Sequence, residues 1–179
     1  NEAVRAFSKR IQSADVSAFF YAGHAVQVDG QNYLLPIDVD VAEEYEISYE
    51  AFPLDRMLAS LEKSDTSLNM VFLDACRNNP YSFSRSATRG IAMTRAPSAT
   101  LVSYATAPDD VAMDGTGRNS PYTKHLVDAI GRPGASLVDV IDLVQRGVRD
   151  ETGGRQRPWV QYDVLPRDFV FVPEQAADL

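Results

Sequence analysis

The sequence predicts an α/β fold with a mostly parallel central sheet. Three short runs rich in β-branched and aromatic residues, at 16–21, 69–74 and 100–105, are apolar on both strand faces, which is typical of buried parallel strands. Amphipathic helical patterns lie before, between and after these runs, and strands that alternate with helices favour a sheet covered by helices. The chain has 179 residues, which is the usual size of one domain. With no linker dividing it, we expect a single domain over 1–179.

The first half of the chain is expected to form a helix, a strand, a hairpin, a second helix and a second strand. Apolar residues recur at helical spacing at the start of the chain and again from Pro53 to Lys63, which predicts two amphipathic helices. Asp29-Gly30 lies between two alternating arms and predicts a tight hairpin, because both turn positions require a positive φ. The expected elements are a helix at 1–12, a strand at 16–21, a hairpin over 26–35, an irregular acidic stretch at 37–52, a helix at 53–63 and a strand at 69–74.

The second half is expected to add two strands and two helices, with two long loops before the helices. Ser120 is a candidate N-cap ahead of Pro121, and Gly153-Gly154 is expected to end the second helix. Loops this long in a compact domain are usually functional or disordered. The expected elements are a loop at 77–99, a strand at 100–105, a loop at 109–120, helices at 121–130 and 136–151, a closing strand at 168–172 and a tail at 173–179.

Composition excludes several classes of protein. The net charge of −8 and the pI near 4.7 oppose a nucleic-acid surface, which needs clustered Lys and Arg. One cysteine can form neither an internal disulfide nor a cysteine-based zinc site. No apolar run approaches the roughly 20 residues that cross a bilayer, and the compartment stays open. The chain begins within a helical pattern and lacks an initiator Met, so we expect it to be a fragment or a processed chain.

His24 and Cys76 are the most informative pair. Each closes an apolar, strand-like run and is followed by turn or loop residues. Parallel strands place their C-terminal ends on one sheet edge, where ligands bind, so the fold is expected to bring the imidazole and the thiol together. A thiol attacks as thiolate, and a neighbouring imidazole can take its proton and later give a proton to the leaving amine. A lone cysteine can also be a small buried apolar group, and the residues alone leave that alternative open.

Five segments together resemble the caspase-like cysteine peptidases, and especially the bacterial caspase homologues near metacaspases and paracaspases. A His about 50 residues before an Ala-Cys-Arg strand end is the caspase arrangement, and 52 positions separate His24 from Cys76. The resembling segments are 21–30, 32–38, 73–80, 104–108 and 119–123, and the terminal Phe-Val-Phe run also fits.

The resemblance implies a three-layer sandwich around a six-stranded, mostly parallel sheet, with a strand, a helix and a second strand preceding residue 1. It implies that Cys76 is the nucleophile and His24 the general acid/base of a Cys–His dyad. The backbone N–H groups of Cys76 and Ala25 would form the oxyanion hole. The family normally has Gly at the position of Ala25, and Ala disfavours a positive φ. A catalytically impaired homologue that acts as an interaction or assembly module is therefore the alternative.

Asp74 implies specificity for a basic side chain. It lies two residues before Cys76 and is expected on the same strand face, where a carboxylate would favour Arg or Lys through a charge-assisted hydrogen bond. Caspases carry Gln at this position, whereas metacaspases carry Asp and cleave after Arg or Lys. A strand-end carboxylate that caps nearby amides is the structural alternative.

The loop 77–99 lies where caspases are cut between their subunits, so Arg85, Arg89 and Arg95 are candidate self-cleavage sites. The other interpretation is a solvated basic loop. No organic cofactor is expected. Several metacaspases use calcium, but Asp109, Asp110 and Asp114 lack a defined ligand spacing. The expected partner is a protein or peptide with Arg or Lys at the cleavage site, and a separate N-terminal fragment or a homodimer is also considered. A flavodoxin-like domain that binds a small ligand is a further hypothesis, although no loop supports it.

Overall fold

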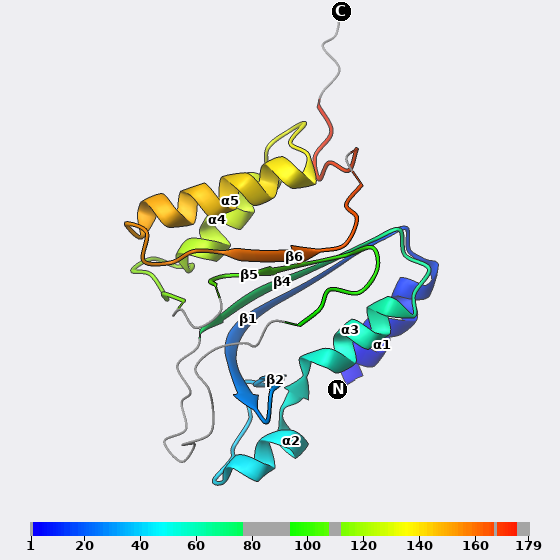
Figure 1. Ribbon diagram of the computed structural model, residues 1–179, viewed down its shortest axis with the longest axis vertical. Helices are drawn as coiled ribbons and strands as arrows, with labels where there is room; N and C mark the ends of the chain where they lie inside the picture. The colour runs from blue at the N-terminus through cyan, green and yellow to red at the C-terminus, as the bar shows by residue number, and fades with distance from the viewer. Residues whose placement is uncertain (1, 77–93, 108–111, 167, 175–179) are drawn as a thin grey trace, which may run out of the picture.

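The central sheet is built from strands that lie far apart in the sequence. The computed structural model describes residues 2–76, 94–107, 112–166 and 168–174 (Figure 1). Within them one six-stranded sheet forms, and β1, β4 and β5 are parallel to one another, whereas each outer strand is antiparallel to its neighbour. In the order of pairing, the strands are β3 (Phe52–Pro53), β2 (Gln31–Leu34), β1 (Val16–Val28), β4 (Leu68–Cys76), β5 (Thr100–Tyr104) and β6 (Trp159–Tyr162).

Helices cover both faces of the sheet, as the sequence predicts. The pair α1 (Glu2–Arg10) and α3 (Leu54–Glu62) lies on one face, and α4 (Pro121–Ile130) and α5 (Leu137–Glu151) lie on the other (Figure 1). Side chains alternate along β4, so Val71 and Leu73 join the core beneath α3, while Met70 and Phe72 join the core beneath α4 and α5. This alternation places Asp74 on the α4 face. The fold is therefore the three-layer α/β sandwich expected from the sequence.

The remaining elements are short. A 3-10 turn, η1 (Ile11–Ser13), continues α1, and the stretch predicted to be irregular contains η2 (Glu44–Glu46) and α2 (Ile47–Glu50). Ile47 of α2 packs with residues of β2 and the end of β1 in a small separate core. Within the part of the chain that the structure describes, no helix combines the length and the apolar character that crossing a bilayer requires.

The first strand is longer than predicted. The sequence predicted a strand at 16–21 with His24 just after its end, but β1 continues without a break to Val28. The strand changes partner instead of ending: its parallel pairing with β4 ends at His24, and antiparallel pairing with β2 begins at Ala25. The hairpin itself is confirmed, because Asp29 and Gly30 have φ values of 50° and 79°.

The predicted closing strand at 168–172 is wrong. Its only strand-like contact among the described residues is an isolated bridge between Ser136 and Val170, and its Phe side chains pack on the core under α4 and α5. The sixth strand is β6, which pairs antiparallel with β5. The signal for β6 was the run Trp159-Val160-Gln161-Tyr162 directly after Pro158, which has the aromatic and β-branched composition of a strand.

Candidate active site

His24 and Cys76 occupy paired positions on neighbouring strands. The parallel register of β1 and β4 runs from Val16 opposite Leu68 to His24 opposite Cys76, and it ends there. Neighbouring strands lie roughly 4.8 Å apart, so the backbones of the two residues lie side by side where the parallel pairing ends. The sequence predicted that the two residues share one edge of the sheet; the contact between thiol and imidazole stays a prediction.

A cavity of about 350 Å³ lies at this edge. His24 is exposed on its wall, and the first turn of α4 forms another part of that wall. The lining therefore combines an imidazole, two carboxylates, a guanidinium, an amide and hydroxyls, and among these the imidazole can move protons and the carboxylates can bind a cation. The polar side chains that line it are His24, Asp74, Asp114, Arg118, Asn119, Ser120 and Thr123.

Asp74 is held in place by the start of α4. Its side chain is buried, with 7% exposure, and the hydroxyls of Ser120 and Thr123 both donate hydrogen bonds to its Oδ2 atom. Ser120 Oγ also accepts the backbone N–H of Thr123 at 3.0 Å, which confirms the predicted N-cap. Two hydroxyl donors offset the cost of burying a carboxylate. The donors among the described residues are hydroxyls, whereas the structural alternative predicted backbone amides.

The described residues donate hydrogen bonds to only one carboxylate oxygen of Asp74. Oδ1 has no hydrogen-bond donor among the residues that the structure describes. Because Asp74 lines the cavity beside His24, a cationic side chain in that cavity could donate to it. Sequence reasoning found Asp74 and Ser120 but missed the hydroxyl of Thr123, whose signal was its place three residues after the N-cap.

Ala25 carries no backbone strain. The non-glycine residues with a positive φ within the described ranges are Asp29 and Ala99, so Ala25 keeps the extended conformation of β1. Its side chain is buried, with 3% exposure. The conformational penalty that a positive φ would impose on Ala at this position therefore does not arise.

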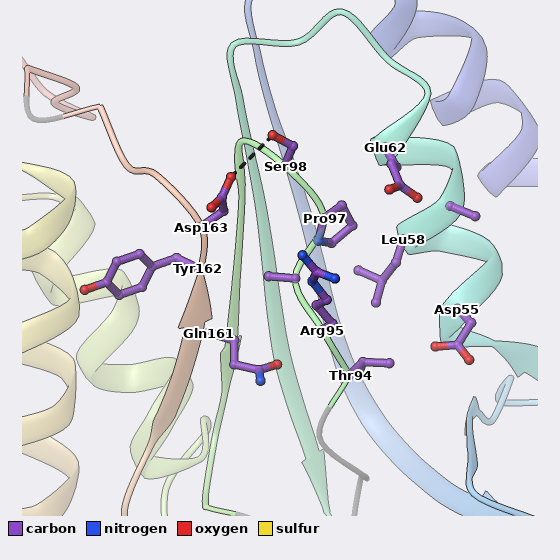
Figure 2. Close-up of a pocket in the computed structure, with 12 residues that line it drawn as sticks. Asp55, Leu58, Glu62, Thr94, Arg95, Pro97, Ser98, Gln161, Tyr162 and Asp163 are labelled. Carbon is purple, nitrogen blue, oxygen red and sulfur yellow. Dashed lines mark hydrogen bonds between the residues drawn. The ribbon is translucent and has the colours of Figure 1, made fainter.

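A larger cavity lies elsewhere, on the α3 side of the sheet. It has a volume of about 690 Å³ and lies between α3, the segment 94–98 and β6 (Figure 2). Three carboxylates, those of Asp55, Glu62 and Asp163, surround Arg95 there, without a histidine or cysteine in the lining. The imidazole of His24 and the carboxylate of Asp74 line the smaller cavity instead.

The candidate self-cleavage residues fall into two groups. Arg85 and Arg89 lie outside the described residues. Arg95 belongs to a segment that packs on the fold: the Thr94 hydroxyl is 3.0 Å from the Tyr104 hydroxyl, and Ala96 packs against the core beneath α3. A peptidase binds its substrate in an extended form, so this packing opposes cleavage after Arg95.

The acids considered for calcium are also divided. Asp109 and Asp110 lie outside the described residues, whereas Asp114 lines the cavity beside His24. Within 2–76, 94–107, 112–166 and 168–174, no three His, Cys, Asp or Glu side chains are grouped as a metal site requires. His125, the second histidine, lies on α4 with its Nε2 atom 2.8 Å from Glu151 on α5, away from the cavity.

Comparison with known proteins agrees with this fold. The protein GSU0716 from Geobacter sulfurreducens superposes with a TM-score of 0.63 at 14% identity, over 97% of this chain and 78% of that chain. Caspase-1 from Spodoptera frugiperda gives 0.53 at 14% identity, over 97% and 73%, and the structure of pro-sf-caspase-1 gives 0.59 at 16% identity, over 97% and 72%. No match was found among curated proteins.

A match to a protein-family model gives the family assignment. The model described as Peptidase_C14, caspase domain, matches residues 1–170. This match covers the paired ends of β1 and β4 and the whole sheet. The chain therefore belongs to the caspase domain family of cysteine peptidases.

Proposed function

We propose that this protein is a cysteine endopeptidase that cleaves peptide bonds after Arg or Lys. The observation that carries the proposal is the register that pairs His24 with Cys76, together with Asp74, which lines the cavity beside His24. The substrate class is protein or peptide, and the reaction needs no organic cofactor.

In the proposed reaction Cys76 attacks as a thiolate and His24 moves the protons. The thiolate sulfur bonds to the scissile carbonyl carbon, whose oxygen becomes an oxyanion facing the N–H groups of Cys76 and Ala25; each such donor typically contributes about 3 kcal/mol. Protonated His24 donates to the leaving amine as the C–N bond breaks, which leaves a thioester. Neutral His24 then takes a proton from water, and the hydroxide releases the acid and restores the thiolate.

Asp74 supports the specificity for a basic residue. A guanidinium or ammonium entering the cavity would meet a buried carboxylate whose Oδ1 atom has no donor from the described residues. The hydroxyls of Ser120 and Thr123 fix the other oxygen, so little ordering of Asp74 is needed when a substrate binds. Charge-assisted hydrogen bonds are roughly twice as strong as neutral ones, which favours Arg and Lys over neutral residues.

A panel of fluorogenic peptides tests the substrate class. Peptides that end in Arg, Lys, Gln and Asp before the fluorophore would be compared with the purified chain, with and without calcium. We expect kcat/KM for Arg and Lys to exceed that for Gln by about 100-fold, and the Asp peptide to remain uncut. Equal turnover of the Gln and Arg peptides would contradict the basic specificity.

We also propose that self-processing, where it occurs, follows Arg85 or Arg89 and not Arg95. The reason is that Arg95 lies between Thr94 and Ala96, which are both held against the fold. Arg95→Ala should leave the pattern of fragments unchanged, whereas Arg85→Ala with Arg89→Ala should abolish it. Intact mass spectrometry reads the outcome directly, and a fragment that begins at Ala96 would show the assignment to be wrong.

A further inference from the structure

We propose that Tyr21 is a positioning residue that holds the peptide unit between His24 and Ala25 through its phenol. This role deepens the proposed function, on which it rests, because that peptide unit joins the acid/base residue to the oxyanion donor. Tyr21 lies on the opposite strand face from His24, beneath the catalytic edge, and it was not among the residues that the sequence singled out.

The phenol of Tyr21 contacts the backbone at the point where β1 changes its partner strand. Its Oη atom is 2.6 Å from the carbonyl oxygen of His24 and 2.8 Å from that of Leu35. The backbone N–H of Leu35 also donates to the His24 carbonyl, at 2.9 Å. The phenol has one proton, which the two carbonyls share, so the His24 carbonyl accepts from the Leu35 N–H and in part from the phenol. The phenol thereby links the end of β2 to this point of β1.

The same contacts set the direction of the Ala25 N–H. Because Leu35 donates to His24, the facing pair Ala25 and Leu34 is a non-hydrogen-bonded pair of the antiparallel ladder, in which N–H groups point away from the partner strand. The Ala25 N–H consequently points away from β2, to the side on which Cys76 pairs with His24. The carbonyl that Tyr21 holds and the N–H of Ala25 belong to one peptide plane, and donors on a carbonyl polarise the N–H across that plane.

The absence of a side chain at Gly23 leaves room for the Tyr21 ring. A Cβ atom at position 23 would lie 2.7 Å from Tyr21 Oη and 3.0 Å from its ring carbon Cζ, which is closer than side chains can approach. The tyrosine ring therefore runs along the strand over Gly23 to reach the His24 carbonyl. This accounts physically for the spacing Tyr-x-Gly-His in 21–24.

The phenol stays a donor over the working range of the site. Burial raises the pKa of Tyr21 to about 12, so the hydroxyl remains protonated at and well above neutral pH.

Tyr21→Phe tests the role in activity, because it keeps the ring and removes the hydroxyl. We expect kcat for the Arg peptide to fall about tenfold with KM within about twofold, since the loss concerns a transition-state donor. Affinity for an Arg aldehyde, which forms a hemithioacetal with an oxyanion-like oxygen, should fall by the same factor. Tyr33→Phe is the matched control: it removes a phenol that bonds only Gln31 among the described residues. Equal effects of the two variants would overturn the proposal.

A second readout does not depend on catalysis. The amide proton of Ala25, observed by NMR, should shift upfield in Tyr21→Phe and stay in place in Tyr33→Phe; an unchanged Ala25 amide would also overturn the proposal. If the wild-type chain cleaves no peptide, the proposed function fails while this measurement still decides the role of Tyr21. If Tyr21→Phe does not fold, Gly23→Ala is used in the same NMR measurement. This variant retains Tyr21 but moves its hydroxyl away from the His24 carbonyl.

Discussion

Cys76→Ala is expected to abolish hydrolysis of the Arg peptide, reducing it to the level of the buffer blank. The reason is that the alanine side chain cannot form the thioester, and the remaining N–H donors cannot replace a nucleophile. The chain has one cysteine, so no second thiol can substitute. Turnover would be measured at saturating peptide, and the melting temperature of the variant would show that the fold is retained. Residual turnover above the blank in Cys76→Ala would refute the nucleophile assignment.

His24→Ala should give nearly the same loss and should also slow alkylation of the thiol. A thiolate reacts with iodoacetamide far faster than a thiol, so removing the proton acceptor beside Cys76 is expected to lower the labelling rate at neutral pH. The chain offers a matched control, since its second histidine, His125, bonds Glu151 between α4 and α5 and does not line the cavity. His125→Ala should keep both the turnover and the labelling rate. Unchanged labelling in His24→Ala would argue against the dyad.

The sequence predicted the central sheet better than its edges. Continuous apolar runs identified the middle of β1, β4 and β5, because strands covered on both faces leave a strong local pattern. Edge elements leave a weaker one: β6 has only four residues, and the stronger β pattern at 168–172 belongs to aromatic residues that pack on α4 and α5. Local propensity cannot tell whether such a segment joins the sheet or packs on the helices, because that depends on which segment reaches the free edge of β5.

The sequence predicted the main residues of the candidate site but not the side chains that hold them in place. His24, Cys76 and Asp74 are found from strand ends and from the family resemblance, because their positions follow from alternation and register. The hydroxyl of Thr123 and the phenol of Tyr21 act across long sequence separations or through the backbone, and no spacing rule reveals such contacts. The expected strain at Ala25 was wrong for the same reason: the continuation of β1 past His24 depends on pairing with β2.

Asp74→Asn is expected to reduce kcat/KM for the Arg peptide by about 100-fold, while the Gln peptide changes by less than about threefold. A hydrogen bond to a charged group contributes about 1.5–3 kcal/mol, and the variant removes the charge while keeping the shape. The asparagine oxygen can still accept from Ser120 and Thr123, which turns its NH₂ group toward the cavity, where it repels a guanidinium. The ratio of the two kcat/KM values isolates specificity from any general loss of activity.

Two controls separate charge from packing at Asp74. Thr123→Val removes one of its hydroxyl donors and keeps the carboxylate, so it should lower the melting temperature while the preference for Arg persists. Asp142→Asn neutralises an exposed carboxylate on α5, paired with Arg146, and should leave kcat/KM unchanged for both peptides. If Asp74→Asn lowers kcat/KM equally for the Arg and Gln peptides, Asp74 supports the architecture of the cavity and the basic specificity must reside in another group. If kcat/KM falls only for the Arg peptide, the buried carboxylate itself selects the substrate, because neither fold stability nor total charge can produce that difference.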